Sequence, residues 1–449
     1  MGAGTAQRGA CLLISGKVRK NMEFVVFAGV LLLLFIFMIV QELIQTKNQE
    51  KLFKKYLREN YGKEPPKEYS LERFARLGSY LERHKEEKQL DDITWNDLGM
   101  DEVFRRIDRT YSAAGEEYLY YTLRNISCGR EALEHLEEVV NWLQGQENIK
   151  VRIQLLMKRL GHLGKYSLYD YLDNLDYLGE RSNRKIVLGN LLYLPFLLLL
   201  FVQPAMGTIG IVLCMLWHIM TYFREKKVIE PYIISFAYVL RLIDVCEELE
   251  KQKIPVYRRE LDELREALKS LLELRRGAYW VMAGNQGKIG GNPLDILADY
   301  LRMILHLDIF QFNRMLEKLR KKTGQVETML AITGYLDMAI SVGGFRKSLE
   351  GYCIPKLEED TEKAFLHMKK GWHPLLSQPV KNSIRADRGI LLTGSNASGK
   401  STFLKMVAVN AVLAQTIHTC AAESYHAPIF QIFSSMALRD SMENGESYY

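Results

Sequence analysis

The stretch "GILLTGSNASGKSTFLK" (389–405) gives the strongest structural signal in the sequence. Residues 394–401 match the pattern G-x-x-x-x-G-K-[ST] in full. In this pattern glycines let the backbone turn tightly, so that its N–H groups point at phosphate oxygens. The apolar run before Gly394 predicts a buried strand, and residues 401–415 predict a helix whose N-terminal dipole favours an anion. Strand, loop and helix together predict a nucleotide site of the P-loop type.

The loop supplies the predicted ATP-binding residues. They are Gly394, Ser395, Asn396, Ala397, Ser398, Gly399, Lys400, Ser401 and Thr402. Lys400 is expected to reach the β and γ phosphates, and the Ser401 hydroxyl is the predicted ligand of Mg²⁺. ATP and Mg²⁺ are therefore the expected cofactors.

The bulk composition is that of an ordinary folded protein. The chain has 449 residues, of which 48% are hydrophobic, and a net charge of +6. This charge allows contact with nucleic acid or anionic lipid but indicates neither. The six cysteines are scattered without a C-x-x-C pair, so neither a disulfide framework nor a zinc site is predicted. Reduced thiols that face the cytosol are the simplest interpretation.

Two apolar regions predict membrane segments. Phe24–Val40 is a run of 17 residues without a charge, which reaches the shorter end of a membrane span. A cleaved signal peptide is the alternative, but the run is long for a signal core and no small-residue cleavage site follows it. Residues 186–223 contain no Asp, Glu, Lys or Arg.

As one helix, residues 186–223 would be roughly 57 Å long, against a bilayer core of ~30 Å. Gln203-Pro204 near the middle predicts a turn, because proline breaks a helix. Two antiparallel spans are therefore expected. A buried helical hairpin in a soluble core is the alternative, although a core helix normally keeps a polar stripe.

Basic residues on both sides of the hairpin predict its topology. They are Arg181, Arg184 and Lys185 before it, and Arg224, Lys226 and Lys227 after it. By the positive-inside rule both ends face the cytoplasm, so we expect a multi-pass protein of the cell membrane with most of its chain cytoplasmic. Lys17, Arg19 and Lys20 argue against the outside N-terminus that this topology requires. Translation from Met22 is one resolution.

The remaining chain has helical periodicity. Between residues 95 and 177 apolar residues recur at helical spacing, among them Leu119, Leu123, Leu133, Leu136, Val140 and Leu143. The stretch "RRELDELREALKSLLELRRG" (258–277) predicts a solvated amphipathic rod, which is either structural, a lever or a dimer contact. The tyrosines of "EEYLYY" (116–121) could stack on bases, but packing is the favoured role. The predicted fold class is mostly α: a membrane-anchored helical core and lever region, followed by a partial α/β P-loop ATPase domain of ABC type.

With its neighbours, the P-loop resembles the ATPase domain of the MutS family of DNA mismatch-repair proteins. The resemblance rests on "GWHPLL" (371–376), "VKNSI" (380–384), "LLTGSNASGKSTFLK" (391–405), "AVLAQ" (411–415), "CAAESY" (420–425) and "IFSSMALRDSMENGESYY" (432–449). Upstream, "IDRTYSAAGEEYLYYTLRNIS" (107–127) resembles the start of the family's helical core. The resemblance implies an ATPase that acts as a dimer on DNA, with ATP held between the P-loop of one subunit and the signature loop of the other.

The resemblance also implies roles for single residues. Asn396 would help to position the γ-phosphate, and Asn382, with the backbone near Val380, would lie by the adenine. Ser447 would belong to the signature loop that reaches the partner's nucleotide. The expected partners are therefore DNA, the membrane and a second copy of the chain.

The sequence departs from the family in several places. Ser395 and Ser398 stand where the repair proteins usually have Pro and Gly, and no Phe-x-Glu mismatch wedge occurs near the N-terminus. No apolar run followed by Asp-Glu, which would hold Mg²⁺ and orient the attacking water, comes after Ser401. Phosphoryl transfer depends on all these parts together. The chain is therefore expected to be truncated in its ATPase domain, to bind ATP poorly and to hydrolyse hardly any, unless another polypeptide supplies the remainder.

These patterns divide the chain into predicted segments. They are an N-terminal segment (1–23), a transmembrane helix (24–44), charged juxtamembrane helices (45–91), a MutS-core-like helical region (92–185), a transmembrane hairpin (186–223), a helical core and lever region (224–370) and a MutS-like P-loop ATPase domain (371–449).

Three functional hypotheses remain open. The leading one is a membrane-associated, MutS-like ATP-binding protein of DNA mismatch repair or maintenance, in which the coupling of ATP hydrolysis to DNA binding is impaired. An ABC-type membrane ATPase for transport or signalling is the second, and a catalytically silent membrane scaffold is the third. Salt-dependent DNA binding would favour the first. Hydrolysis stimulated by a substrate in liposomes without DNA would favour the second, and binding of neither nucleotide nor DNA would leave the third.

Overall fold

The computed structural model describes residues 37, 40–41, 44–63, 69, 71–85, 88–126, 129–163, 167–275, 300–359, 364–395 and 398–436. The chain divides into two compact units, Met1–Asn60 and Tyr61–Tyr449. In the first unit, residues 44–60 form a helix, as the charged juxtamembrane stretch predicts. Most of the predicted transmembrane helix at 24–44 lies outside the described residues.

The second unit is mostly helical, which confirms the mostly-α part of the predicted class. Its α-helices are α2 (Leu71–Arg83), α3 (Asp92–Leu98), α4 (Met100–Ile107), α5 (Ala113–Arg124), α6 (Arg130–Gly145), α7 (Glu147–Leu160), α8 (Leu168–Asp173), α9 (Arg184–Leu191), α10 (Tyr193–Val202), α11 (Pro204–Glu250), α12 (Arg258–Leu271), α15 (Leu307–Arg320), α16 (Thr323–Ser348) and α17 (Lys400–Ile417). Short 3₁₀ turns lie at Leu175–Leu178, Pro255–Tyr257 and Leu272–Arg275. The strands are β1 (Lys356–Glu358), β2 (Leu366–Gly371), β3 (Asn382–Ala386) and β4 (Ser424–Pro428).

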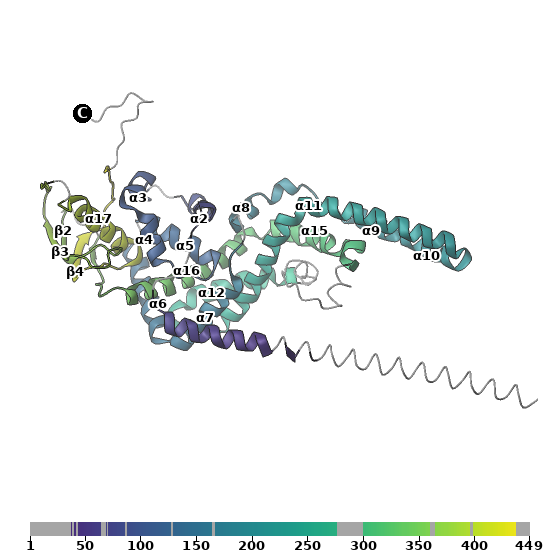
Figure 1. Ribbon diagram of the computed structural model, residues 1–449, viewed down its shortest axis with the longest axis horizontal. Coiled ribbons are helices and arrows are strands. Elements are labelled where there is room, and N and C mark those ends of the chain that lie inside the picture. The colour runs from purple at the N-terminus through teal and green to yellow at the C-terminus, as the bar shows by residue number, and fades with distance from the viewer. Residues whose placement is uncertain are drawn as a thin grey trace, which may run out of the picture. The chain divides into compact units, whose positions relative to one another are not determined.

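Helix α16 is the centre of the helical body. Most of its 26 residues are buried, and α5, α6 and α12 pack around it (Figure 1). The apolar faces of these neighbours follow the helical period, with Leu119, Leu133 and Leu136 almost fully buried. In α12 the buried residues include Leu261, Leu264 and Leu268, so its apolar stripe packs inside this chain. The amphipathic rod at 258–277 is therefore structural over the length of α12.

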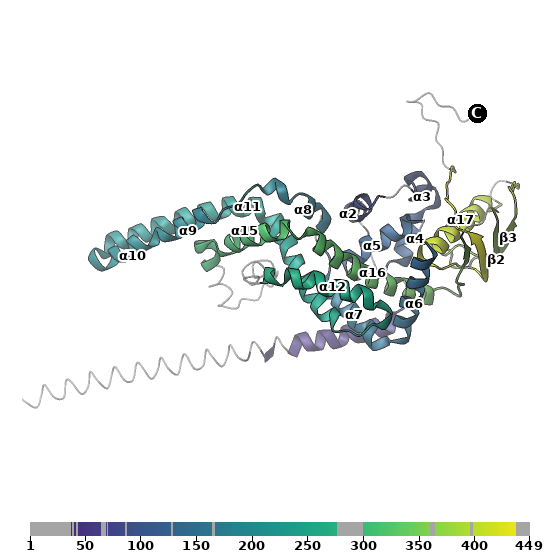
Figure 2. The ribbon, with the colours of Figure 1, turned by 180° about the vertical axis from the view of Figure 1, so that it is seen from behind.

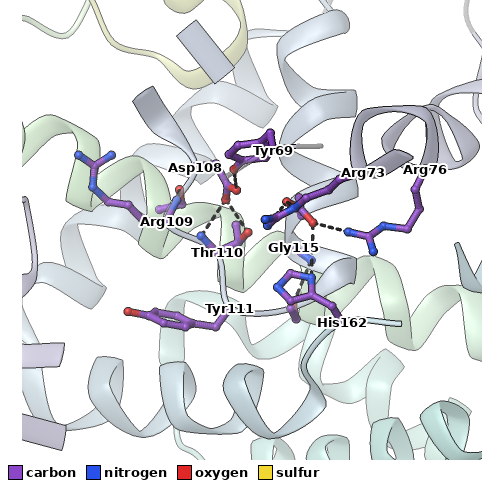
Figure 3. A network of polar contacts seen from close by, with 12 residues as sticks. Tyr69, Arg73, Arg76, Asp108, Arg109, Thr110, Tyr111, Gly115 and His162 are labelled. Carbon is purple, nitrogen blue, oxygen red and sulfur yellow. Dashed lines mark hydrogen bonds and ion pairs between the residues drawn. The ribbon is translucent and has the colours of Figure 1, made fainter. Parts of the chain in front are cut away.

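A network of buried charges fixes the loop before α5 (Figure 3). Glu116, which is fully buried, accepts hydrogen bonds from Arg73 Nε at 2.7 Å and from Arg76 Nη2 at 2.8 Å. His162 Nδ1 lies 3.4 Å from the same carboxylate. Asp108 accepts from the backbone N–H of Thr110 at 2.9 Å. Because a buried carboxylate is stable only when it is paired, these partners hold the helices that supply them in one arrangement.

A third carboxylate, on the central helix, holds the residues at the start of α5. Asp337 of α16 is fully buried and accepts from Ser112 N–H at 2.8 Å and from Ser112 Oγ at 2.6 Å. The Tyr111 N–H donates to it at 3.0 Å. Gly115 in the first turn of α5 leaves the room that this carboxylate occupies. The stretch at 107–127 is thus a packing and capping element of the core.

Replacing Gly115 with alanine is expected to lower the free energy of unfolding by about 1–3 kcal/mol. A Cβ at this position would collide with the Asp337 carboxylate and push it away from its backbone donors. The matched control is Gly78→Ala in α2, where an added Cβ meets nothing within 4 Å. This control is expected to gain about 0.5–1 kcal/mol from helix propensity. Denaturant titration of the full chain in detergent compares the two, and an equal loss in both would contradict the clash.

The tyrosines at 116–121 lie in the aromatic core. The rings of Tyr118 and Tyr121 contact Tyr80, with centroids 5.6 and 5.1 Å away, and Tyr120 packs edge-to-face on Trp95 at 5.0 Å. Such geometry is typical of stabilising aromatic pairs. The structure confirms the favoured role of packing.

The predicted hairpin forms and turns at the predicted place. Helix α10 ends at Val202, and Pro204 is the first residue of α11. The two helices lie side by side (Figures 1 and 2). A Cβ on Gly207 would lie 2.6 Å from the backbone nitrogen of Leu200, so a glycine is needed for this close approach. Helix α11 continues beyond the hairpin. It has 47 residues in all, from Pro204 to Glu250, and Pro231 lies inside it.

Most of the hairpin's large apolar side chains are exposed. They include Leu188, Leu198, Phe201, Val202, Leu213 and Met220. Three described helices are long and apolar enough to cross a membrane: Arg184–Val202, Pro204–Glu230 and Thr323–Ser348. The third is the central core helix, and 83% of its apolar window is buried. Of the three helices, only the two of the hairpin therefore expose their apolar side chains within the described residues.

Polar side chains of the hairpin turn toward residues 304–305. Asn190 Nδ2 donates to Leu305 O at 3.1 Å, and His218 Nδ1 lies 2.8 Å from Ile304 O. His218 is buried, in contrast to the apolar side chains on the other faces of the helix. These two polar side chains are thus packed against protein, as is typical of polar groups in membrane helices.

A small mixed sheet and α17 form the C-terminal part of the described chain. The strand order is β1-β4-β2-β3, with β1 parallel to β4 and the other pairs antiparallel. Helix α17 packs against β2 (Figure 2). The loop at 394–399 connects β3 to the N-terminus of α17 in the chain order.

Candidate phosphate-binding site

The loop before α17 has the two glycines where its geometry needs them. Gly399 has φ +86°, a left-handed conformation that L side chains rarely adopt, and it is the N-cap of α17. At Gly394 a Cβ would lie 2.9 Å from Ser398 Oγ. The loop closes on itself through Ser398 N–H, which donates to Ser395 O at 3.3 Å. Both glycines therefore have a physical reason in this fold.

Lys400 folds over the loop. Its Nζ donates to the carbonyl oxygens of Gly394 and Ser395, each at 2.6 Å. The ammonium group is therefore held at the mouth of the loop, next to the first turn of α17. The Ser401 and Thr402 side chains follow on this turn and are exposed. An anion bound there would meet a helix N-terminus and a lysine.

The predicted buried strand before Gly394 is wrong for this chain. Residues 389–395 form no strand, and Ile390 and Leu391 are exposed, Leu391 by 88%. The sheet ends at β3, and none of the described strands pairs with residues 389–395. An apolar run becomes a buried strand only where neighbouring strands and a covering layer receive it. The helix predicted at 401–415 is confirmed as α17.

Three predicted residues lie outside the described part of the chain. They are Asn396 and Ala397 in the loop and Ser447 near the end of the sequence. Their implied roles stay predictions. Asn382 and Val380 are described, and Asn382 Nδ2 donates to Val380 O at 3.1 Å. Both are exposed at the start of β3, and their place beside an adenine stays a prediction.

Two buried amides fasten α17 to the surrounding loops. Asn410 Nδ2 donates to Trp372 O at 3.0 Å, and Asn410 Oδ1 accepts from Ala421 N–H at 2.7 Å. Gln415 exchanges both bonds with one residue: its Nε2 donates to Phe430 O at 3.1 Å, and its Oε1 accepts from Phe430 N–H at 2.7 Å. Each amide uses both a donor and an acceptor, so each fixes the direction as well as the position of the loop that it holds. The loop at 394–399 therefore leads into a helix whose body is rigidly placed.

The far end of α17 is joined to the helical core by Arg346, which the sequence analysis missed. This residue of α16 is 1% exposed. Its guanidinium donates to Thr419 Oγ1 at 2.8 Å, to His418 O at 3.0 Å and to Glu137 Oε2 of α6 at 2.7 Å. Burial opposes ionisation of Glu137, but hydrogen bonds from His418 and Arg346 outweigh it and lower the pKa of this carboxyl to about 2. The network joins α6, α16 and the segment after α17 through charge-assisted bonds.

The residues present fit a phosphate-bearing nucleotide. The fit rests on the left-handed Gly399, on the N-terminus of α17 and on Lys400 at the mouth of the loop. Among the described residues no group of three or more His, Cys, Asp or Glu side chains could hold a metal ion. A Mg²⁺ ion at this loop would therefore be held by the Ser401 hydroxyl together with the oxygens of the nucleotide phosphates.

Curated relatives share part of this sequence. A DNA mismatch repair protein MutS of Acholeplasma laidlawii is 31% identical over 144 residues, which cover 31% of this chain and 17% of that protein. The protein of the same name in Leptospira interrogans is 30% identical over 159 residues, 33% of this chain and 18% of that protein. A third, of Thermotoga maritima, is 30% identical over 119 residues, 25% of this chain and 14% of that protein. The chain thus spans less than a fifth of the length of each of these relatives, and no family model matches it.

Proposed function

Because the chain belongs to the MutS family through the part that these relatives share, we propose that it binds MgATP at residues 394–402. The observation that supports the proposal is the placement of Lys400 over the loop at the N-terminus of α17. A bound nucleotide would supply phosphate oxygens that replace the Gly394 and Ser395 carbonyls as partners of Nζ. Ser401 would hold the magnesium ion, and the backbone of the loop would orient the phosphates.

Within this proposal, nucleotide binding is communicated to the helical core. The loop is the N-terminus of α17, and the segment after α17 is bonded to Arg346 of the central helix. A helix is stiff, so a shift at one end of α17 is carried to the other end. We infer that ATP acts on the arrangement of α6, α16 and α17 rather than on the loop alone.

The proposed partners of the chain are DNA, the membrane and a second copy of the chain. The names of the relatives support DNA as the macromolecule on which the chain acts, and the family resemblance supports a dimer that shares its nucleotides. The exposed apolar hairpin supports a place in the cell membrane. With three basic residues on each side of the hairpin, the helical body and the phosphate loop would face the cytoplasm.

The proposal is tested by nucleotide binding to the full chain in detergent micelles. A fluorescent ATP analogue is expected to bind in the presence of Mg²⁺, and Lys400→Ala is expected to weaken binding at least about tenfold, since a charge-assisted hydrogen bond contributes about 1.5–3 kcal/mol. The matched control is Lys405→Ala, which removes a lysine from the same helix outside the loop. No binding by the unchanged chain, or equal loss in both variants, would contradict a phosphate site at this loop.

A further inference from the structure

Two cysteines from distant parts of the sequence stand opposite each other beside α17. Cys353 follows α16, and Cys420 follows α17. Cys353 N–H donates to Cys420 O at 2.9 Å, and Cys420 N–H donates to Cys353 O at 3.0 Å, so that the two residues form an antiparallel bridge. Two residues that exchange both hydrogen bonds have Cα atoms about 5.5 Å apart and side chains on the same face. A disulfide normally joins Cα atoms about 4.4–6.8 Å apart, so the Cα spacing typical of such a pair lies in the disulfide range. The Cβ atoms of a directly opposed pair are about 4.5–5.5 Å apart and must approach to about 3.5–4.5 Å for the bond to form.

The two thiols differ in exposure and in acidity. Cys353 is partly exposed, and a hydrogen bond from the Cys420 thiol lowers the pKa of its own thiol. Cys420 is fully buried, and burial raises the pKa of its thiol well above the usual range. Cys420 Sγ also lies 3.5 Å from Asn410 O, the alternative acceptor for its single S–H group. An accessible, more acidic thiol beside a buried one is the arrangement of an attacking and a resolving cysteine.

We propose that Cys353 and Cys420 form a reversible redox pair that takes a small disulfide, such as glutathione disulfide, as its oxidant. The Cys353 thiolate attacks one sulfur of glutathione disulfide, which forms a mixed disulfide and releases one glutathione thiolate. This thiolate takes the proton of Cys420, whose sulfur attacks Cys353 Sγ. The Cys353–Cys420 bond forms and the second glutathione leaves as a thiolate. The protein thiols lose two electrons, and both electrons reduce glutathione disulfide.

The disulfide would change the surroundings of α17. It would tie the segment after α16 to the segment after α17. It would also remove the S–H group of Cys420 that can donate a hydrogen bond to Asn410 O. Asn410 lies on α17, and Thr419, the neighbour of Cys420, is a partner of Arg346. Oxidation therefore acts on the same helix that begins at the phosphate loop. The inference goes beyond nucleotide binding and does not depend on it.

The experiment uses the full chain in detergent, treated with glutathione disulfide and digested without reductant for mass spectrometry. A peptide pair linked through Cys353 and Cys420 is expected, and it should disappear after reduction. Cys420→Ser is expected to trap the mixed disulfide of glutathione on Cys353, because no resolving thiol remains. Cys353→Ser is expected to leave Cys420 unmodified while the protein is folded, since Cys420 is buried.

A third variant controls for general effects of losing a cysteine. Cys246 is a buried thiol of α11 away from this pair, so Cys246→Ser is expected to form the Cys353–Cys420 link as the unchanged chain does. In the folded chain Cys353 is expected to react at least about tenfold faster than Cys246, and denaturation should remove this difference. Absence of the linked peptide from the unchanged chain, or equal reaction rates at Cys353 and Cys246, would overturn the proposal whether or not the variants fold.

Discussion

Replacing Arg346 with alanine is expected to lower the free energy of unfolding by about 3 kcal/mol, the size of loss seen when one partner of a buried ion pair is removed. Arg346 is 1% exposed and bonds to Glu137, Thr419 and the backbone of His418. Without the guanidinium, the Glu137 carboxylate loses one of the donors that keep its pKa at about 2, and the carbonyl of His418 loses its hydrogen bond. Denaturant titration of the full chain in detergent at neutral pH measures the loss.

The matched control for Arg346 is Arg83→Ala. Arg83 pairs with two carboxylates, Asp173 and Glu327, but its side chain is partly exposed. Surface ion pairs contribute about 0–1 kcal/mol, so this control should be nearly neutral. The loss of unfolding free energy for Arg346→Lys should lie between those for Arg346→Ala and Arg83→Ala, because lysine keeps the charge but cannot form the bidentate pair with Glu137. A loss of less than about 1 kcal/mol for Arg346→Ala would show that α6, α16 and α17 do not depend on this side chain.

Placing an arginine at Leu213 is expected to disfavour membrane insertion of the hairpin by about 2.5–3.5 kcal/mol. Leu213 is 62% exposed near the middle of the second apolar helix. If lipid surrounds it, the added charge must enter the bilayer core; if water surrounds it, the change is nearly neutral. Insertion is measured with a cysteine introduced in the turn by Gln203→Cys. If the hairpin crosses the membrane, this cysteine lies outside the cell and reacts with a membrane-impermeant maleimide in intact cells.

The control for Leu213 is Ile93→Arg in α3, where the replaced side chain is 61% exposed. Maleimide labelling of the chain with Gln203→Cys alone is expected to be strong, and adding Ile93→Arg should leave it strong. Adding Leu213→Arg instead should make the labelling severalfold weaker. The chain without Gln203→Cys gives the background from its native cysteines. Absence of labelling above this background would contradict a hairpin that crosses the membrane.

The sequence predicted the helical class and the hairpin because both depend on local patterns. Apolar residues at helical spacing, such as Leu133 and Leu136, are buried as their spacing requires. Proline at position 204 ends one helix and starts another because it lacks an N–H group, whatever surrounds it. The glycine at 399 and the lysine at 400 are also explained by the loop itself.

The features that the sequence did not predict depend on contacts between distant residues. Arg346 lies at the end of a mostly apolar helix, and nothing in its neighbourhood indicates a partner on α6 or beyond α17. Cys353 and Cys420 are 67 positions apart in the sequence and were interpreted as scattered thiols. The stretch "GILLTG" has a strand-like composition, but strand formation requires neighbours that residues 389–395 do not meet among the described strands.

The length of α11 has a mechanical consequence. One helix of 47 residues, about 70 Å long, belongs first to the hairpin and then to the packed body. Its one internal proline, Pro231, directly follows the apolar span that ends at Glu230. Proline removes a hydrogen bond to the preceding turn, so the bending stiffness of the helix is lowest at this joint. If the hairpin lies in lipid, its tilting would be absorbed there as a change of angle, and rotation about the helix axis would pass through to the core.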